Sequence, residues 1–438
     1  MMNEQGYRSL SQFIFSHNVV LGQIVFPFII LGVYYLSGFY KEVFNKSRIQ
    51  EVITTILSTF VCTVILYLIA LINDNVRERF QNYELILFLW ILLFIFTYIG
   101  RAIITTISNY KFYRGIWHYN TLIIGNGKAA YDFKKDLEKY DRASGYNILG
   151  LVNIPHEKPY YENGDIYELE NLEDVCKKLE IKCLIIIPSR NDPKSLMKLI
   201  SNLYPLNLIM KISPDSYDII ISRARIRNFY GEPLADLSGT NMSASSCNIK
   251  RLIDVVASTL TLLILLPLFG ILSILIKIDS KGNIIYTQKR VGYHNKEFNI
   301  YKFRTMAQDA EVDGIPLLSS ENDNRITPLG KFLRKYRLDE LPQFWNVIKG
   351  DMSIVGPRPE RKYYIAEIMK VSPYYTLLHQ VRPGITSMGM VKFGYASDVP
   401  SMVKRLKYDL LYLENMSLVN DMKIIAYTIK TVLTGKGL

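Results

Sequence analysis

Cysteine and histidine are scarce in this sequence: its 438 residues include four cysteines and five histidines. The cysteines form no C-x-x-C pair, and the histidines are scattered along the chain. A disulfide framework or a thiolate zinc site needs cysteines at close, regular spacing, so the sequence supports neither. Its apolar content of 49% also excludes a disordered tail protein or a collagen-like fibre.

Acidic residues are fewer than basic ones. The 52 Lys and Arg against 40 Asp and Glu give a formal net charge of +12. A basic chain favours anionic partners, which include nucleic acid, a phospholipid surface and a phosphorylated substrate. Charge alone does not choose among these partners.

Charge is absent from three long apolar runs near the N-terminus: Val19–Leu36, Val52–Asn73 and Leu85–Gly100. About 20 apolar residues are enough to cross the hydrocarbon core of a bilayer. The third run is short, and Arg101 must snorkel to the interface unless the helix continues to about Thr106. We predict a transmembrane α-helical bundle of three spans in residues 1–110. Buried core helices are the alternative, which the close succession of the runs disfavours.

Basic residues fix the expected orientation of these spans. They lie between the first and second runs, at 41–48, and after the third run, at 101–114. By the positive-inside rule both regions face the cytosol, so the chain beyond about residue 110 is expected there.

A fourth run, uncharged from Val255 to Ile276, has Pro267 near its middle and basic residues on both flanks. Proline removes a backbone hydrogen bond from a helix, so a bend is expected there. The basic flanks favour a hairpin, residues 252–278, that re-enters one leaflet with both ends in the cytosol. A straight fourth span is the alternative, and it would place the C-terminal third outside.

Residues 119–237 are predicted to form an α/β Rossmann-like domain. A short apolar strand leads into Gly125, Gly127 and Ala130 at G-x-G-x-x-A spacing, and further strand-like runs alternate with helical ones. A lone motif of this kind is a weak sign of dinucleotide binding, and no acidic residue ends a second strand at the ribose position. An empty or regulatory module is therefore preferred. A Ser- and Asn-rich linker is predicted at 238–249.

Two adjacent carboxylates, Asp339 and Glu340, lie in the segment LDELP. Its proline suits the first turn of a helix, which would place both carboxylates at a helix N-terminus. There the helix dipole favours the ionised form, as an anionic nucleophile or a magnesium ligand requires. Taken alone, Asp339 is more simply a helix cap.

Cationic residues argue for more than a cap. The candidates for binding phosphate are Lys302, Arg304, Arg334 and Arg358. Arginine offers a planar fork that matches phosphate oxygens. A basic face held against anionic lipid is the alternative, but it needs only net charge. It explains Arg358 poorly, because that residue lies in the rigid turn 356–359.

Several motifs occur in an order that resembles the bacterial sugar transferase family, the polyprenyl-phosphate hexose-1-phosphate transferases. These motifs are Lys250-Arg251 with Asp254, the Pro267 hairpin, and the segments 288–292, 302–306, 338–343, 350–359 and 382–386. The resemblance covers about residues 248–438, and the preceding segments resemble the long, multi-span form of the family. It implies an α+β monotopic phosphoglycosyl transferase domain at 250–438 with a re-entrant membrane helix. It also implies a multi-pass protein of the bacterial inner (cytoplasmic) membrane, with its catalytic domain on the cytosolic face.

The resemblance further implies transfer of a hexose 1-phosphate from a nucleotide diphosphate sugar, such as a UDP-hexose, to undecaprenyl phosphate, with release of UMP. It assigns Asp339 as the nucleophile of a covalent aspartyl-phosphosugar mechanism and Glu340 as a ligand of Mg²⁺, with Asp421 as a further metal ligand. The four candidate cations match positions around the phosphates. Membrane lipids are expected partners and nucleic acid is not, and a homo-oligomer is compatible with the sequence.

Other readings remain open. A membrane-tethered NAD-dependent nucleotide-sugar dehydratase or epimerase would use the Gly125 loop and a Tyr-x-x-x-Lys helix, of which no convincing example is present. A non-enzymatic scaffold leaves Asp339, Arg334 and Arg358 unexplained. A single displacement, with Asp339 as base or metal ligand, is the alternative mechanism. Capsule, O-antigen and exopolysaccharide synthesis are equally compatible pathways.

Overall fold

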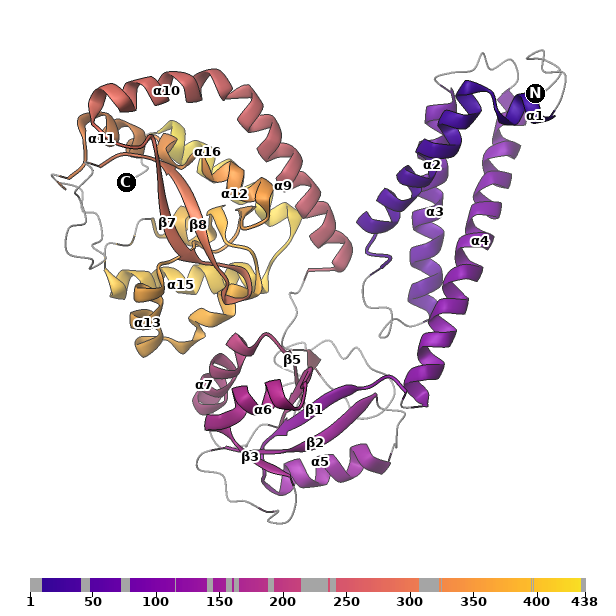
Figure 1. The fold of residues 1–438 in the computed structure, drawn as a ribbon, viewed down its shortest axis with the longest axis horizontal. Coiled ribbons are helices and arrows are strands. Elements are labelled where there is room, and N and C mark those ends of the chain that lie inside the picture. The colour runs from indigo at the N-terminus through magenta and orange to yellow at the C-terminus, as the bar shows by residue number, and fades with distance from the viewer. Residues whose placement is uncertain are drawn as a thin grey trace. The chain divides into compact units, whose positions relative to one another are not determined.

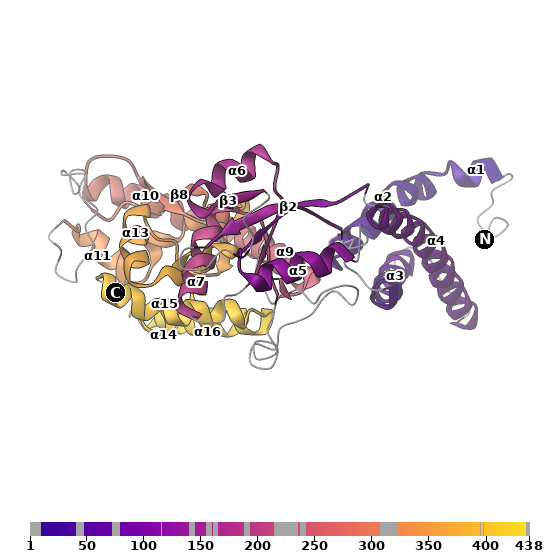
Figure 2. The same ribbon diagram turned by 90° about the horizontal axis from the view of Figure 1, so that it is seen from below.

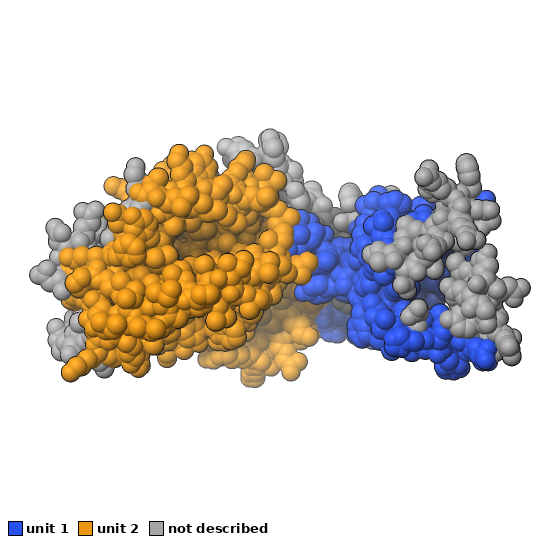
Figure 3. Space-filling view, turned by 90° about the horizontal axis from the view of Figure 1, so that it is seen from above, with its two compact units in different colours: residues 1–118, 243–249 blue, residues 119–242, 250–438 orange. Residues whose placement is uncertain are grey.

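The chain forms two compact units (Figure 3), Met1–His118 with Ser243–Ile249, and Tyr119–Met242 with Lys250–Leu438. The predicted middle and C-terminal domains therefore belong to one unit. The computed structural model describes residues 10–40, 48–71, 79–114, 116–139, 145–154, 160, 165–187, 193–213, 235–236, 242–306, 323, 325–394, 396 and 398–434.

Apolar helices build the first unit: α1 (Leu10–Ile14), α2 (His17–Leu36), α3 (Arg48–Leu71) and α4 (Arg79–Tyr113). Helix α3 packs beside both α2 and α4 (Figure 2). Within the part of the chain that the structure describes, three helical stretches are long and apolar enough to cross a membrane: Val19–Leu36, Glu51–Ile69 and Ile86–Lys111. The three apolar runs predicted as spans are thus confirmed as long apolar helices, which indicates that the chain associates with a membrane.

Arg101 is not the last residue of its helix, since α4 continues to Tyr113. Its Nε lies 3.3 Å from Glu51 Oε1, and its Nη1 donates a hydrogen bond to Thr55 Oγ1 at 3.3 Å. Glu51 is 1% exposed and also accepts a hydrogen bond from Thr105 Oγ1 at 2.8 Å. Snorkelling of Arg101 was therefore the wrong alternative, because a buried partner on α3 compensates its charge.

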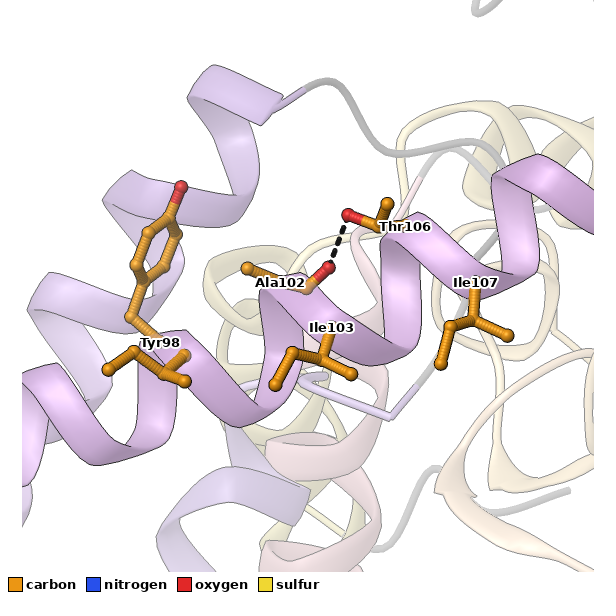
Figure 4. A pocket seen from close by; sticks show the side chains of 6 residues that line it. Tyr98, Ala102, Ile103, Thr106 and Ile107 are labelled. Atoms are coloured by element: carbon orange, nitrogen blue, oxygen red, sulfur yellow. Dashed lines mark hydrogen bonds between the residues drawn. The ribbon is translucent and has the colours of Figure 1, made fainter.

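A shallow apolar groove runs along one side of α4 (Figure 4). Its lining consists of Tyr98, Ile99, Ala102, Ile103, Thr106 and Ile107. The Thr106 hydroxyl donates to the Ala102 carbonyl at 2.6 Å, so its polarity is satisfied within the helix. This lining suits hydrocarbon and offers no charge for a polar substrate.

The second unit contains a six-stranded sheet with the strand order β3-β2-β1-β4-β5-β6 (Figure 1). Its strands are β1 (Tyr119–Ile124), β2 (Tyr146–Asn153), β3 (Ile166–Glu168), β4 (Cys183–Ile186), β5 (Ile209–Ile212) and β6 (Ala235–Asp236). All neighbours are parallel except β6, which is antiparallel to β5. Helices α6 (Leu172–Lys178) and α7 (Pro193–Leu203) pack on one face and α5 (Lys128–Lys139) packs on the other. Strand β4 is fully buried, as expected of a strand covered on both faces.

The predicted glycine-rich turn connects β1 to α5. Gly125 has φ +130°, a backbone conformation that residues with a Cβ rarely adopt. Strand β2 ends at Asn153, so the position at which a dinucleotide-binding domain carries a ribose-binding carboxylate is an amide here. In the side chain of Asn153, Nδ2 donates to Glu168 Oε1 at 2.6 Å and Oδ1 accepts from Asn126 Nδ2 at 2.9 Å.

A bent helix pair follows: α9 (Ala244–Ile264) and α10 (Leu266–Asp279) meet at 61°. The break falls at Leu265, and Pro267 is the second residue of α10. The bend predicted at Pro267 is confirmed, and the proline lies in the first turn of α10, where its missing amide breaks no hydrogen bond within the helix. The bounds differ from the prediction: α9 starts at Ala244, so the predicted linker is wrong from that residue onward, and its residues 238–241 lie outside the described part.

The remaining chain combines two strand pairs with short helices. β7 (Ile285–Val291) and β8 (Glu297–Phe303) form an antiparallel hairpin, and β9 (Ser353–Val355) pairs in parallel with β10 (Gly384–Thr386). The helices are α11 (Pro328–Lys335), α12 (Gln343–Lys349), α13 (Lys362–Val371), α14 (Met388–Lys392), α15 (Val399–Glu414) and α16 (Leu418–Leu433). Three 3₁₀ turns complete it: η4 (Tyr293–Asn295), η5 (Leu338–Glu340) and η6 (Pro373–Gln380). Buried apolar side chains of α13, η6 and α15 form one of its cores.

Candidate active site

Glu340 is surrounded by cations from three parts of the chain. Lys302 Nζ, near the end of β8, donates to Glu340 Oε1 at 2.7 Å, and Arg358 Nη2 donates to the same oxygen at 3.2 Å. Arg337 Nη1 lies 3.4 Å from Glu340 Oε2. The fold therefore brings together three of the predicted site residues, Lys302, Glu340 and Arg358.

The two carboxylates lie in a tight turn before α12. After α11 ends, Arg337 adopts a left-handed backbone with φ +52°, and the 3₁₀ turn η5 follows. Helix α12 starts only at Gln343, with Pro342 as its N-cap. The prediction that Asp339 and Glu340 lie at a helix N-terminus is therefore wrong. They belong to a separate turn, in which the change of chain direction depends on the left-handed backbone of Arg337.

Burial and charge give the two carboxylates different pKa values. Burial raises the pKa of Asp339 to about 6, although Lys302 lowers it. Burial also raises the pKa of Glu340, but the charges of Lys302, Arg358 and Arg337 together outweigh burial and hold that pKa well below its usual range. The pair thus contains one acid that stays ionised and one that ionises just below neutral pH. We expected the helix dipole to keep Asp339 ionised; burial is the larger effect.

Asp339 differs from Glu340 in its contacts as well. Asp339 is only 7% exposed, yet its carboxylate makes no hydrogen bond or ion pair among the described residues. A carboxylate whose lone pairs are not engaged can attack an electrophile once it is ionised. The geometry therefore leaves Asp339 available for bond formation and holds Glu340 in place.

Arg334 approaches Asp339 from α11. Its Nε donates to Thr305 Oγ1 at 2.9 Å, and its charge lowers the pKa of Asp339. The N-cap Thr327 accepts from the Gly330 amide at 3.0 Å, which fixes the start of the helix. A Cβ on Gly330 would lie 2.1 Å from the Thr305 carbonyl oxygen, so only glycine permits this close packing.

Arg304 is held at the end of α10. Its Nη2 donates to the carbonyl oxygens of Ile276 at 3.2 Å and Ser280 at 2.5 Å, at the end of α10. The Arg304 residue is 9% exposed, and its Nε and Nη1 are buried without a partner among the described residues. The contacts of Nη2 therefore anchor the second arm of the bent helix pair, and the predicted role of Arg304 toward phosphate stays a prediction.

Asp421 is held by α9 and α15. Its Oδ2 accepts from Lys250 Nζ at 2.5 Å, and its Oδ1 accepts from Tyr412 Oη at 2.7 Å. Lys250 Nζ also donates to the Val355 carbonyl at 3.0 Å. Burial raises the pKa of Asp421, while Lys250 lowers it. These contacts join α16 to the first turns of α9, and the predicted metal role of Asp421 stays a prediction.

The acidic groups can be compared with the needs of Mg²⁺. Among the described residues, no group of three or more His, Cys, Asp or Glu is placed to hold a metal ion. Magnesium at phosphoryl-transfer sites is commonly bound by one or two carboxylates together with substrate phosphates and water. Asp339 and Glu340 are adjacent carboxylates of this kind, so the residues fit a metal that arrives with a diphosphate substrate.

Sequence reasoning missed one buried group beside this site. Glu360, two residues after Arg358, binds Arg290 and Arg405. Arg290 belongs to the cluster at 288–292, whereas Glu360 comes directly after the Gly-Pro-Arg-Pro turn, so the motifs marked one of the three residues. Arg405 carries no signal of its own, because it lies in an ordinary amphipathic helix.

The sequence is similar to known proteins across this part of the chain. The model of the family "Bacterial sugar transferase" matches residues 245–435. The UDP-N-acetylgalactosamine-undecaprenyl-phosphate N-acetylgalactosaminephosphotransferase of Aeromonas hydrophila is 39% identical over 220 residues, 50% of this chain and 51% of that protein. The UDP-glucose:undecaprenyl-phosphate glucose-1-phosphate transferase of Escherichia coli (strain K12) is 32% identical, over 65% of this chain and 61% of that protein.

A shorter relative is matched almost completely. The exopolysaccharide production protein PSS of Rhizobium leguminosarum bv. phaseoli is 39% identical over 196 residues, 43% of this chain and 98% of that protein. By contrast, the match spans 51% of the Aeromonas protein and 61% of the Escherichia coli protein. The family match and the coverage of the Rhizobium protein establish that this chain belongs to the bacterial sugar transferase family.

Proposed function

We propose that this chain transfers a hexose 1-phosphate from a nucleotide diphosphate sugar, a UDP-hexose, to undecaprenyl phosphate and releases UMP. The observation that carries the proposal is the contrast within the acidic pair. Glu340 is fixed by Lys302, Arg358 and Arg337, whereas the buried Asp339 beside it has no hydrogen-bond partner among the described residues. The names of the Aeromonas and Escherichia coli relatives support the substrate classes.

The proposed reaction has two displacements. An ionised Asp339 oxygen attacks the phosphorus that bears the sugar, the bond from that phosphorus to the bridging oxygen breaks, and UMP leaves. An oxygen of undecaprenyl phosphate then attacks the same phosphorus, and the carboxylate of Asp339 is released. The product is a lipid-linked diphosphate sugar, and each step exchanges one P–O bond for another.

Lys302, Arg334 and Arg358 offset the negative charge that a diphosphate brings toward the carboxylate. Glu340 would hold Mg²⁺ together with substrate phosphates, and the ion would supply further positive charge at the leaving phosphate. Glu340 also holds Lys302 and Arg358 near each other before substrate binds, because both donate to one of its oxygens. This preorganisation reduces the cost of ordering two long side chains at the moment of reaction.

The fold supports a location for this chemistry. The pair α9–α10, bent by 61° with basic residues on both flanks, supports a hairpin that re-enters one leaflet. The positive-inside rule then places the catalytic residues on the cytosolic face of the inner membrane. The sheet of β1 to β6, parallel except for β6, supports a Rossmann-like module beside the transferase segment.

The test is nucleoside monophosphate release by the purified full chain with a panel of nucleotide sugars and undecaprenyl phosphate. Asp339→Asn should lower the rate about a thousandfold or more, because it removes the nucleophile. Glu367→Gln, at a partly exposed Glu paired with Lys370 on α13, serves as a matched control and should be unaffected. Unchanged turnover by Asp339→Asn would exclude the role of Asp339.

A second measurement separates the covalent mechanism from a single displacement. Incubation with the UDP-sugar alone, without lipid acceptor, should add the mass of one hexose phosphate to the chain at Asp339. Intact-protein and peptide mass spectrometry detects this adduct. If UMP release requires the lipid acceptor and no adduct forms under any condition, a direct displacement with Asp339 as base or metal ligand is the mechanism.

A further inference from the structure

The turn that carries Arg358 leads into a second charged cluster, which the proposed reaction does not use. Glu360 is 4% exposed. Its Oε1 accepts from Arg405 Nη2 at 2.5 Å, and its Oε2 accepts from Arg290 Nη1 at 3.1 Å. Arg290 lies on β7 and Arg405 lies on α15. One buried carboxylate therefore joins two elements that are distant in the sequence.

Arg290 also holds the backbone next to Arg358. Its Nη1 donates to the Pro359 carbonyl at 3.2 Å. The amide of the next residue, Val291, donates to the Glu360 carbonyl at 3.1 Å. Two hydrogen bonds thus fix the backbone that follows Arg358 against β7, in addition to the ion pair of the Glu360 side chain.

The backbone before Arg358 is fixed as well. The Gly384 amide donates to the Pro357 carbonyl at 2.9 Å. A Cβ on Gly384 would lie 2.1 Å from the Gly356 nitrogen, so the backbone segments around these two glycines are in close contact. Arg358 is therefore carried between two anchored segments, and its Nη2 reaches Glu340 Oε1 at 3.2 Å.

The charges make Glu360 the component on which this arrangement depends. Arg290, Arg405 and Arg358 all exert their positive charge on it. Arg358 and Arg290 also repel each other through the interior. A second acid, Asp409, faces Arg405 but accepts from the Gly389 amide at 2.9 Å. Without the Glu360 charge, the buried Arg290 guanidinium would lose its acidic partner, and removal of one partner of such a group is costly.

We propose that Glu360 is a positioning residue: by bridging Arg290 and Arg405 it fixes the turn that directs Arg358 toward Glu340 and toward the substrate phosphate. The role toward phosphate rests on the proposed function, whereas the role toward Arg358 rests on the contacts alone. Glu360 does not touch the reacting atoms. It acts through Arg358, so its effect must vanish when Arg358 is absent.

The first test is a double-mutant cycle on the full chain. Glu360→Gln should lower kcat for UMP release about tenfold and change KM for the UDP-sugar less. In an Arg358→Ala background it should cause no further loss, because the residue through which it acts is gone. A full additional loss in that background would overturn the proposal and assign Glu360 a general structural role. Glu360→Asp should restore part of the rate, and Glu367→Gln is the unaffected control.

If Glu360→Gln does not fold, Arg405→Lys provides the same cycle. Lysine keeps the positive charge but lacks the guanidinium fork, so the bridge is weakened and the interior charge is not left unbalanced. We expect the same pattern at smaller amplitude, with a loss of kcat that disappears in the Arg358→Ala background. A loss that persists there would contradict the proposal.

The second test needs no catalysis. Phenylglyoxal modifies arginine, and peptide mass spectrometry follows the modification of Arg358 with time. Glu360→Gln should raise that rate several-fold, because the turn no longer holds the guanidinium against Glu340, and Glu367→Gln should leave it unchanged. An unchanged rate in Glu360→Gln overturns the positioning role. Suppose that the parent protein releases no nucleoside monophosphate, yet Glu360→Gln still raises the rate of Arg358 modification. That result would support the positioning role and refute the proposed function.

Discussion

Replacing Asp339 by asparagine should remove activity and also stabilise the folded chain at pH 8. Burial raises the pKa of Asp339 from 3.8 to about 6, so the folded state binds this proton more tightly than the unfolded state does. Its contribution to stability is full below about pH 4 and is lost as the pH rises from about 4 to about 6. At about 1.4 kcal/mol per tenfold change in proton affinity, ionisation costs about 3 kcal/mol above that range and about half as much at pH 5.

Asparagine has nearly the same shape and cannot ionise, so it escapes this cost. The measurement is the Tm of the full chain in detergent at pH 5 and pH 8, for the parent protein, Asp339→Asn and Glu340→Gln. Asp339→Asn should raise Tm by several degrees at pH 8 and by about half as much at pH 5. Glu340→Gln should lower it, because the pKa of Glu340 is depressed and its loss leaves Lys302 and Arg358 without a buried counter-charge.

The same pKa sets the acid limb of the rate. Asp339 is protonated below about pH 6 in the substrate-free chain, so kcat/KM should rise about tenfold per pH unit below that value and level off above it. A lower Tm for Asp339→Asn at pH 8, or an equal change at pH 5 and pH 8, would refute the electrostatic reasoning. Loss of activity alone would not, since several roles for Asp339 share that result.

Three further outcomes are expected. Asp421→Asn should lower Tm and leave the Mg²⁺ concentration for half-maximal activity unchanged, because Asp421 binds Lys250 and Tyr412; a shift in the magnesium requirement would restore the metal role. Gly384→Ala should abolish UMP release, since its Cβ would meet backbone atoms, whereas Gly270→Ala, with open space around it, should be silent; equal activities would contradict this. Glu51→Gln should destabilise the first unit by about 3 kcal/mol, and an added Arg101→Met should recover most of that loss, as a double-mutant cycle in thermal unfolding would show.

The sequence predicted the features that depend on neighbouring residues. Uncharged runs long enough to span a bilayer became α2, α3 and α4, because apolar length alone decides that property. The bend beside Pro267 followed from the missing amide of proline, and the alternation of strands and helices in 119–237 produced the mixed α/β sheet. The ordered motifs of the C-terminal part identified the family.

The sequence did not predict the contacts between residues that are distant along the chain. Lys302 and Glu340 are 38 positions apart, and Lys250 and Asp421 are 171 apart. Sequence spacing carries no measure of such distances, so the contact of Arg304 with the end of α10 was not predicted, and the Glu360 cluster was missed. The start of α12 also shifted, because a left-handed Arg337 inserted a separate turn.

The sequence by itself determined the long apolar helices, the bend beside Pro267, the alternation of strands and helices in 119–237, and which residue types serve phosphate chemistry. The tertiary structure decided which carboxylate the cations hold and which one remains without a hydrogen bond. Both outcomes have a physical reason. Hydrophobic periodicity and proline act within a few residues, whereas burial and charge pairing exist only after packing has removed water and brought remote side chains within hydrogen-bonding distance.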